Sequence, residues 1–217
     1  MHETEAFILE HVERREADFL YTLYTKDFGL IRATAQGVRK EGAKLRGHLE
    51  PFSKSGVIVV SGKSGYRLTG AVAVNHYPHI RSSLYLLQSA MRASAIVGRS
   101  FYEEKDAVLW GTLNEFFDAL ATADDSDDAS LQVFFWFCVR ILEILGYRPS
   151  ADTIFSKTPR LKNVFSDYEN NGARSAMEKP LPNGAREAIS DALGRAFEEN
   201  TGERFGFFRA PFILETA

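Results

Sequence analysis

The chain has 217 residues, a formal net charge of −3, 45% hydrophobic residues and a single cysteine. This apolar fraction excludes a disordered or collagen-like chain, and one cysteine excludes an internal disulfide or a zinc site built from several cysteines. No stretch approaches the ~20 apolar residues of a membrane span, and the N-terminus lacks the apolar core of a secretion signal. We therefore expect a cytoplasmic protein that does not enter a membrane.

The charges are distributed unevenly along the chain. Residues 32–67 carry eight basic and two acidic side chains, whereas the residues from 81 onward carry 15 basic and 20 acidic side chains. This asymmetry is expected when one domain meets a polyanion and the other does not. It points to a nucleic-acid partner for the N-terminal part.

The N-terminal part of the chain has the pattern of short strands. Apolar, alternating and β-branched stretches predict strands at residues 6–14, 18–24, 28–35, 56–61 and 66–74. The glycine-rich, basic residues 37–44 predict a loop, and residues 62–65, GKSG, predict a hairpin turn. Five short strands favour a small closed barrel, for which the OB-fold is the common solution.

After Pro78 the apolar residues recur at helical spacing. They predict helices at residues 80–97, 108–120, 131–145 and 184–200, with a polar, irregular stretch at residues 150–183. We therefore expect an α+β protein of two domains, a five-stranded OB-fold at residues 1–78 and an all-helical domain at residues 79–217.

The acidic run of residues 124–128, DDSDD, comes just before the third predicted helix. A calcium loop would need further ligands at fixed spacing, including a terminal glutamate, and these are absent. We expect a solvated linker and helix N-cap, because carboxylates are favourable at a helix N-terminus.

Residues typical of enzyme sites have structural explanations in this sequence. The GKS of residues 62–64 lacks the glycine spacing of a phosphate-binding P-loop and precedes a strand, so a hairpin turn is favoured, although Lys63 can still contact phosphate. Cys138 lies among aromatic residues and is expected in the core. His76 and His79 have no third metal ligand nearby. We expect a protein that is not an enzyme.

The basic segment from Gly37 to Arg46 is the most informative part of the sequence. Its cations lie on a loop between barrel strands, and its glycines allow the backbone to approach a phosphate chain closely. Five aromatic residues could offer stacking faces for bases: Tyr21, Tyr24, Phe28, Phe52 and Tyr66. The composition equally allows a merely solvated loop with the aromatic residues inside the barrel.

Several motifs together resemble one protein family. Residues 6–9 (AFIL), 22–31 (TLYTKDFGLI), 35–40 (AQGVRK) and 45–52 (LRGHLEPF) have the order and spacing of the N-terminal domain of the bacterial RecO family of DNA repair proteins. Residues 142–149 (LEILGYRP) are similar to a helix end of the same family.

The resemblance implies an OB-fold followed by a helical domain, and a recombination mediator that binds single- and double-stranded DNA and anneals complementary strands. It also implies RecR and the C-terminal tail of single-stranded DNA-binding protein as partners. With RecR, such a protein helps to load RecA onto coated single strands at the nucleoid. Matching positions assign phosphate contacts to the basic loop, through Arg39, Lys40, Lys44 and Arg46. Weaker candidates for phosphate contacts are Arg32, Lys63 and Arg67.

One departure from the family concerns metal binding. Many relatives carry a four-cysteine zinc module after the LGYxP motif, whereas residues 148–172 contain no cysteine. We therefore expect no zinc and no other cofactor. Two other hypotheses remain open: a protein-interaction adaptor whose basic loop is incidental, and a hydrolase with an unrecognised site.

Overall fold

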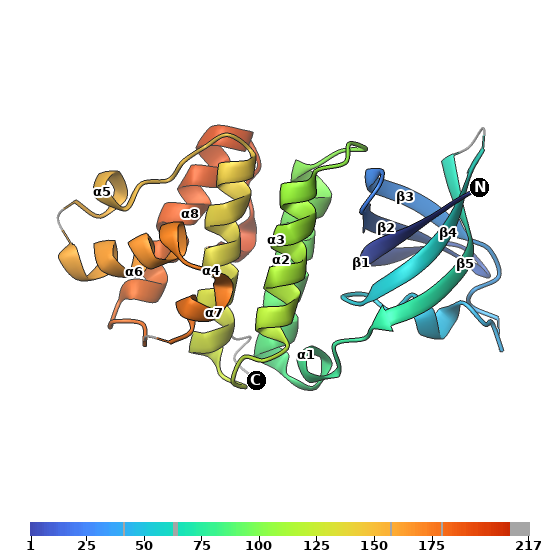
Figure 1. The fold of residues 1–217 in the computed structure, drawn as a ribbon, viewed down its shortest axis with the longest axis horizontal. Coiled ribbons are helices and arrows are strands. Elements are labelled where there is room, and N and C mark those ends of the chain that lie inside the picture. Colours follow the sequence, from blue (N-terminus) through green and yellow to red (C-terminus); the bar gives the residue numbers. More distant parts are fainter. Residues whose placement is uncertain (41, 63–64, 157, 179, 209–217) are drawn as a thin grey trace. The chain divides into compact units, whose positions relative to one another are not determined.

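The computed structural model describes residues 1–40, 42–62, 65–156, 158–178 and 180–208 (Figure 1). The chain forms two compact units: residues 1–78 with residues 94–110, and residues 79–93 with the residues from 111 onward. The first unit contains all the strands of the described part, and the second is helical. The two-domain boundary at residue 78 stays a prediction.

Five strands make up the barrel of the first unit: β1 (His2–Arg15), β2 (Asp18–Thr25), β3 (Gly29–Ala35), β4 (Lys54–Gly62) and β5 (Gly65–Asn75). They close in the order β1-β2-β3-β5-β4, and only β3 and β5 pair in parallel. This five-stranded Greek-key barrel is an OB-fold, as predicted.

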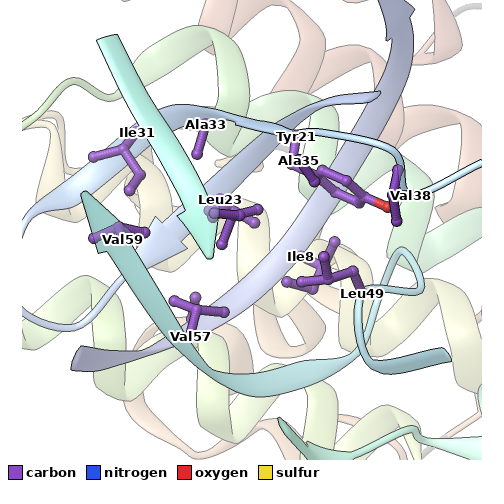
Figure 2. Packing of buried hydrophobic residues seen from close by; sticks show 12 residues of the cluster. Ile8, Tyr21, Leu23, Ile31, Ala33, Ala35, Val38, Leu49, Val57 and Val59 are labelled. Carbon is purple, nitrogen blue, oxygen red and sulfur yellow. The ribbon is translucent and has the colours of Figure 1, made fainter. Parts of the chain in front are cut away.

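The barrel core is built from alternating residues of its strands and from two residues of a loop. In β3, Ile31, Ala33 and Ala35 point inward, whereas the residues between them face outward. Val38 and Leu49, from the β3–β4 connection, are 1% exposed and pack in the same cluster. Figure 2 shows both of them beside the labelled strand residues of the core. The connection is thus fixed to the barrel by apolar burial.

The turn between β2 and β3 depends on a glycine. Gly29 has φ +70°, and a Cβ there would lie 2.1 Å from the carbonyl oxygen of Glu104. The hydroxyl of Thr25 closes the turn, because it donates to the carbonyl of Gly29 and accepts from the N–H of Phe28. The β2–β3 register has no shift, so Gly29 serves this close approach and does not form a β-bulge.

The helices of the described part are α1 (Pro78–Ser82), α2 (Leu84–Ser100), α3 (Ala107–Leu120), α4 (Asp127–Ile144), α5 (Ala151–Ile154), α6 (Pro159–Asn170), α7 (Ala173–Ala176) and α8 (Ala185–Thr201). Short 3₁₀ turns occur at η1 (Arg46–His48) and η2 (Gly206–Phe208). The first predicted helix is interrupted at Ser83, whose hydroxyl accepts from the N–H of Leu86 and begins α2. In the described part, no helix is long and apolar enough to span a membrane.

The prediction of an irregular stretch at residues 150–183 is wrong where α5, α6 and α7 form. Pro159 stands in the first turn of α6, and Leu161, Phe165 and Tyr168 place one buried stripe on that helix. The Phe165 ring lies 5.5 Å from that of Phe155. The stripe escaped prediction because polar residues outnumber it, although its spacing is helical.

The acidic run of residues 124–128 makes several contacts within the helical unit. Ser126 caps α4 by accepting from the N–H of Ala129 at 3.2 Å, which confirms the predicted N-cap. Arg186, from α8, binds Asp127 at 2.5 Å and Asp128 at 2.7 Å. These carboxylates therefore have an internal partner in addition to the helix N-terminus.

Candidate nucleic-acid interface

The basic loop, residues 37–46, follows β3 and is docked on the turn between β1 and β2. The N–H of Gly37 donates to the Oδ1 of Asp18 at 2.9 Å, and the N–H of Arg39 donates to the carbonyl of Ala17 at 3.2 Å. Gly37 has φ +68°, which favours glycine at this bend. Together with the buried side chain of Val38, these bonds fix the start of the loop.

The four cations assigned to this loop are all exposed: Arg39, Lys40, Lys44 and Arg46. Within the described residues, the side chains of Lys40, Lys44 and Arg46 make no hydrogen bond and no ion pair. The structure thus gathers cations on a short connection whose apolar residues are anchored in the barrel. Such cations can bind phosphate without first breaking an internal contact.

Arg39 differs from the other three cations because it is held in place. Its Nη1 donates to the Oε2 of Glu13 at 2.9 Å, and its guanidinium carbon lies 5.6 Å from the centroid of the Phe19 ring. The ring of His11 is also stacked on that of Phe19, with 4.2 Å between the ring centroids. Arg39 is therefore fixed by one charged and one aromatic contact, both from the β1–β2 hairpin.

A second basic group lies on the outer wall of the barrel. Arg32 faces outward on β3, and Arg67 of β5 is the register partner of Thr34. The Nη1 of Arg14 donates to the Oγ1 of Thr34 at 2.6 Å. We call Arg14, Arg32 and Arg67 the barrel-wall patch. Arg14 was missed by the sequence interpretation because the pairing of β1, β2 and β3 is needed to bring it here.

Lys63, the remaining candidate, lies outside the described residues together with Ser64. The residues on either side of them, Gly62 and Gly65, pair across β4 and β5, which confirms the predicted hairpin in place of a P-loop. In a P-loop, a strand would instead lead through the glycines into a helix.

The five candidate stacking residues contribute mainly to packing. Tyr21 and Tyr24 are 1% exposed, and Phe28 and Tyr66 pack against the barrel core. Phe52 is half-buried and has φ +61°. Burial raises the pKa of both Tyr21 and Tyr24 to about 12, with smaller effects of nearby carboxylates. These two tyrosines are core residues, so any stacking must use other rings.

Acidic residues of β1 and β2 reduce the positive charge of the barrel. Residues 1–31 carry seven acidic and three basic side chains, which the count over residues 32–67 left out. Two of these acidic residues pair directly with basic ones: Glu13 with Arg39, and Glu5 with Lys54 at 3.4 Å. The barrel therefore carries side chains of both charges. The cations of the basic loop differ from Lys54 in that three of them have no ion pair among the described residues.

Residues that the sequence offered for other chemistry have structural roles. Cys138 is fully buried in α4, as predicted, and burial raises the pKa of its thiol well above the usual value. The Nε2 of His79 lies 2.8 Å from the carbonyl oxygen of Ala123. Among the residues that the structure describes, no three histidine, cysteine or acidic side chains form a group that could hold a metal ion.

A cavity of about 570 Å³ in the helical unit has an amphipathic lining. Apolar side chains of α4, α5 and α8 line it together with two exposed arginines and the exposed carboxylate of Glu199. These apolar residues and arginines include Leu142, Ile154, Ala192, Ala196, Arg148 and Arg195. Neither arginine makes a side-chain hydrogen bond or ion pair with another described residue. The cavity lies beyond the end of α4 at Ile144, where Gly146, with a φ of +89°, turns the chain toward Arg148.

Comparison with known proteins relates both the barrel and a larger part of the chain to RecO proteins. Residues 1–77 match the family model described as Recombination protein O N terminal. The chain is 33% identical over 146 residues to a DNA repair protein RecO of Dehalococcoides mccartyi, and 30% identical over 154 residues to one of Syntrophus aciditrophicus. A third, from Geobacter metallireducens, is 31% identical over 150 residues.

These similarities extend beyond the barrel. The three alignments cover 67%, 70% and 69% of this chain, and so include much of the helical unit. They span 56%, 58% and 60% of the lengths of the three relatives, which is less than two thirds in each case.

Proposed function

Because the chain belongs to the RecO family of DNA repair proteins, we propose that it is a DNA-binding recombination mediator in bacterial DNA repair. In this proposal it binds single- and double-stranded DNA through phosphates, anneals complementary strands and, with RecR, helps to load RecA onto strands coated by single-stranded DNA-binding protein. It works in the cytoplasm at the nucleoid. The role is one of binding and needs no catalytic group.

One observation carries the DNA-binding part of the proposal. Lys40, Lys44 and Arg46 are exposed and unpaired among the described residues, on a connection that Val38 and Leu49 anchor in the barrel core. A loop whose backbone is already anchored loses less conformational entropy when it binds than a free segment does, and phosphate contacts of this kind carry little base specificity. The barrel-wall patch offers further cations, and Lys63 remains a candidate.

The test is a salt titration of fluorescent single-stranded DNA binding, with annealing of complementary strands as a second readout. We expect tight binding at low salt. For each phosphate neutralised, the logarithm of the affinity should fall by roughly 0.7 to 0.9 for every tenfold rise in salt concentration. Annealing should follow the same salt dependence. Binding without annealing would reduce the role to that of a general OB-fold binder. No retention of DNA at low salt would favour the protein-interaction adaptor.

The cavity of the helical unit supports a proposed site for the tail of single-stranded DNA-binding protein. An acidic peptide with an apolar C-terminal residue needs a small apolar pocket beside cations. The cavity supplies Leu142, Ile154 and Ala192 as the apolar part, and Arg148 and Arg195 as cations for carboxylates. We place the tail here, with its terminal carboxylate at an arginine.

This site can be tested with a labelled acidic peptide that ends in phenylalanine. Arg195→Ala and Arg148→Ala should each weaken binding, whereas Arg160→Ala, which removes an exposed arginine outside the cavity, should leave it unchanged. Amidation of the peptide terminus should weaken binding to the wild type. Equal effects of all three substitutions would show only general attraction by charge.

A further inference from the structure

Arg39 is the one cation of the basic loop whose side chain already has an anionic partner in the described part of the chain. Its Nη1 is bonded to the Oε2 of Glu13 at 2.9 Å, across 26 residues of sequence. Within the described residues its other guanidinium nitrogens make no hydrogen bond. A phosphate that approaches Arg39 therefore encounters a guanidinium that is already bonded to a carboxylate.

We infer that Glu13 competes with DNA phosphate for Arg39 and holds the DNA affinity of the basic loop below the value that its cations alone would give. This inference rests on the proposed DNA-binding function of the loop. To bind Arg39, a phosphate must displace the Glu13 carboxylate or share the guanidinium with it, because Arg39 is not a free cation.

Glu13 also helps to position Arg39, but Arg39 does not depend on this contact alone. The guanidinium also lies over the Phe19 ring at 5.6 Å, and this contact does not depend on Glu13. His11 is stacked on the same ring and supports it. The backbone N–H of Arg39 is bonded to Ala17. Arg39 therefore keeps two other contacts when the carboxylate is lost, and neither of them carries a negative charge.

The ion pair is also easily opened. The side chain of Arg39 is 34% exposed and that of Glu13 is 65% exposed, so water screens their attraction. Exposed pairs of this kind contribute little to stability. Removing the carboxylate should therefore leave the fold intact and act mainly on an incoming anion.

The experiment compares Glu13→Gln with Glu16→Gln in the full chain. Both substitutions remove one negative charge from exposed residues near the β1–β2 turn, but only Glu13 contacts Arg39. At low salt, Glu13→Gln should bind single-stranded DNA about two- to fivefold more tightly than the wild type, because an exposed charge pair is removed. The gain should shrink as salt rises, and Glu16→Gln should show much less of it.

The Arg39→Ala background distinguishes the inference from the proposed function. If Glu13 acts through Arg39, adding Glu13→Gln to Arg39→Ala should give no further gain. A gain of the same size in that background, or an equal gain for Glu16→Gln, would overturn the inference and leave DNA binding by the loop intact. Unchanged or weaker binding by Glu13→Gln would also overturn it. If removing all four loop cations leaves DNA binding unchanged, the proposed function itself fails.

Discussion

The basic loop and the acidic run each carry four charges of one sign in the sequence, yet the fold uses these charges in opposite ways. In the acidic run, Asp127 and Asp128 both bind Arg186. In the basic loop, Lys40 and Lys44 have no side-chain partner among the described residues. The difference shows that a charged segment points to a binding surface only when the fold leaves its charges unpaired.

The largest effect on DNA affinity is expected from removing the loop cations. We expect the variant with Arg39, Lys40, Lys44 and Arg46 all changed to Ala to lose about two to three orders of magnitude in DNA affinity near ~0.1 M salt, since four phosphate contacts are lost. Its free energy of unfolding should stay close to that of the wild type. Fluorescence anisotropy and urea unfolding measure the two quantities. A large loss of stability would show that the loop charges are structural.

The buried residues of the same connection should behave in the reverse way. Leu49 is 1% exposed within the barrel core, so Leu49→Ala should lower the free energy of unfolding by about 2 to 4 kcal/mol. Urea unfolding measures the loss. Exposed Lys44→Ala is the matched control and should cost almost nothing. Equal costs for both would contradict the division of this connection into an apolar anchor and exposed cations.

In the helical unit, the charges themselves should contribute to stability. Arg186→Ala leaves two carboxylates without their partner and should cost about 1 to 2 kcal/mol of unfolding free energy. DNA affinity should not fall, because the loop is untouched. The control is Arg160→Ala, which removes an exposed arginine of α6. If Arg186→Ala is as stable as this control, the acidic run is merely solvated.

The smallest effect at neutral pH is expected from the buried phenol beneath the basic loop. The pKa of Tyr21 is raised from 10.0 to about 12, chiefly by burial, with smaller contributions from Glu50, which raises it, and Arg46, which lowers it. The folded state thus favours the protonated phenol. This contribution to stability is complete below pH 10.0 and is lost as the pH rises through about 12. Tyr21→Phe should make the decline of unfolding free energy over that range shallower. An unchanged decline would place the phenol in water.

The barrel was largely predictable because strand periodicity, turn residues and strand count are local properties of the sequence. The five predicted strands all lie within or next to observed ones, and the hairpin at residues 62–65 is confirmed. The break at Ser83 and the helix α6 were missed. In α6, the high average polarity of the residues hid three apolar residues at helical spacing. Average polarity indicates how much of a segment contacts solvent, but not which conformation the segment adopts.

The pairing of charges was not predictable, since it depends on the register of distant strands. Glu13 reaches Arg39 only because β1 and β2 pair so that the start of the basic loop lies against their turn. Arg14 joins the barrel-wall patch for the same reason, through Thr34. A count of charges along the chain detects neither contact. It therefore overstated how basic the barrel is.

The most direct test of the central claim is a paired salt titration of single-stranded DNA binding by the wild type and the four-cation variant. If the basic loop contacts phosphate through Arg39, Lys40, Lys44 and Arg46, the slope of log affinity against log salt should become shallower by roughly 3, or about 0.7 to 0.9 per contact. Equal slopes for the two proteins would contradict the account, because the loop cations would then neutralise no phosphate.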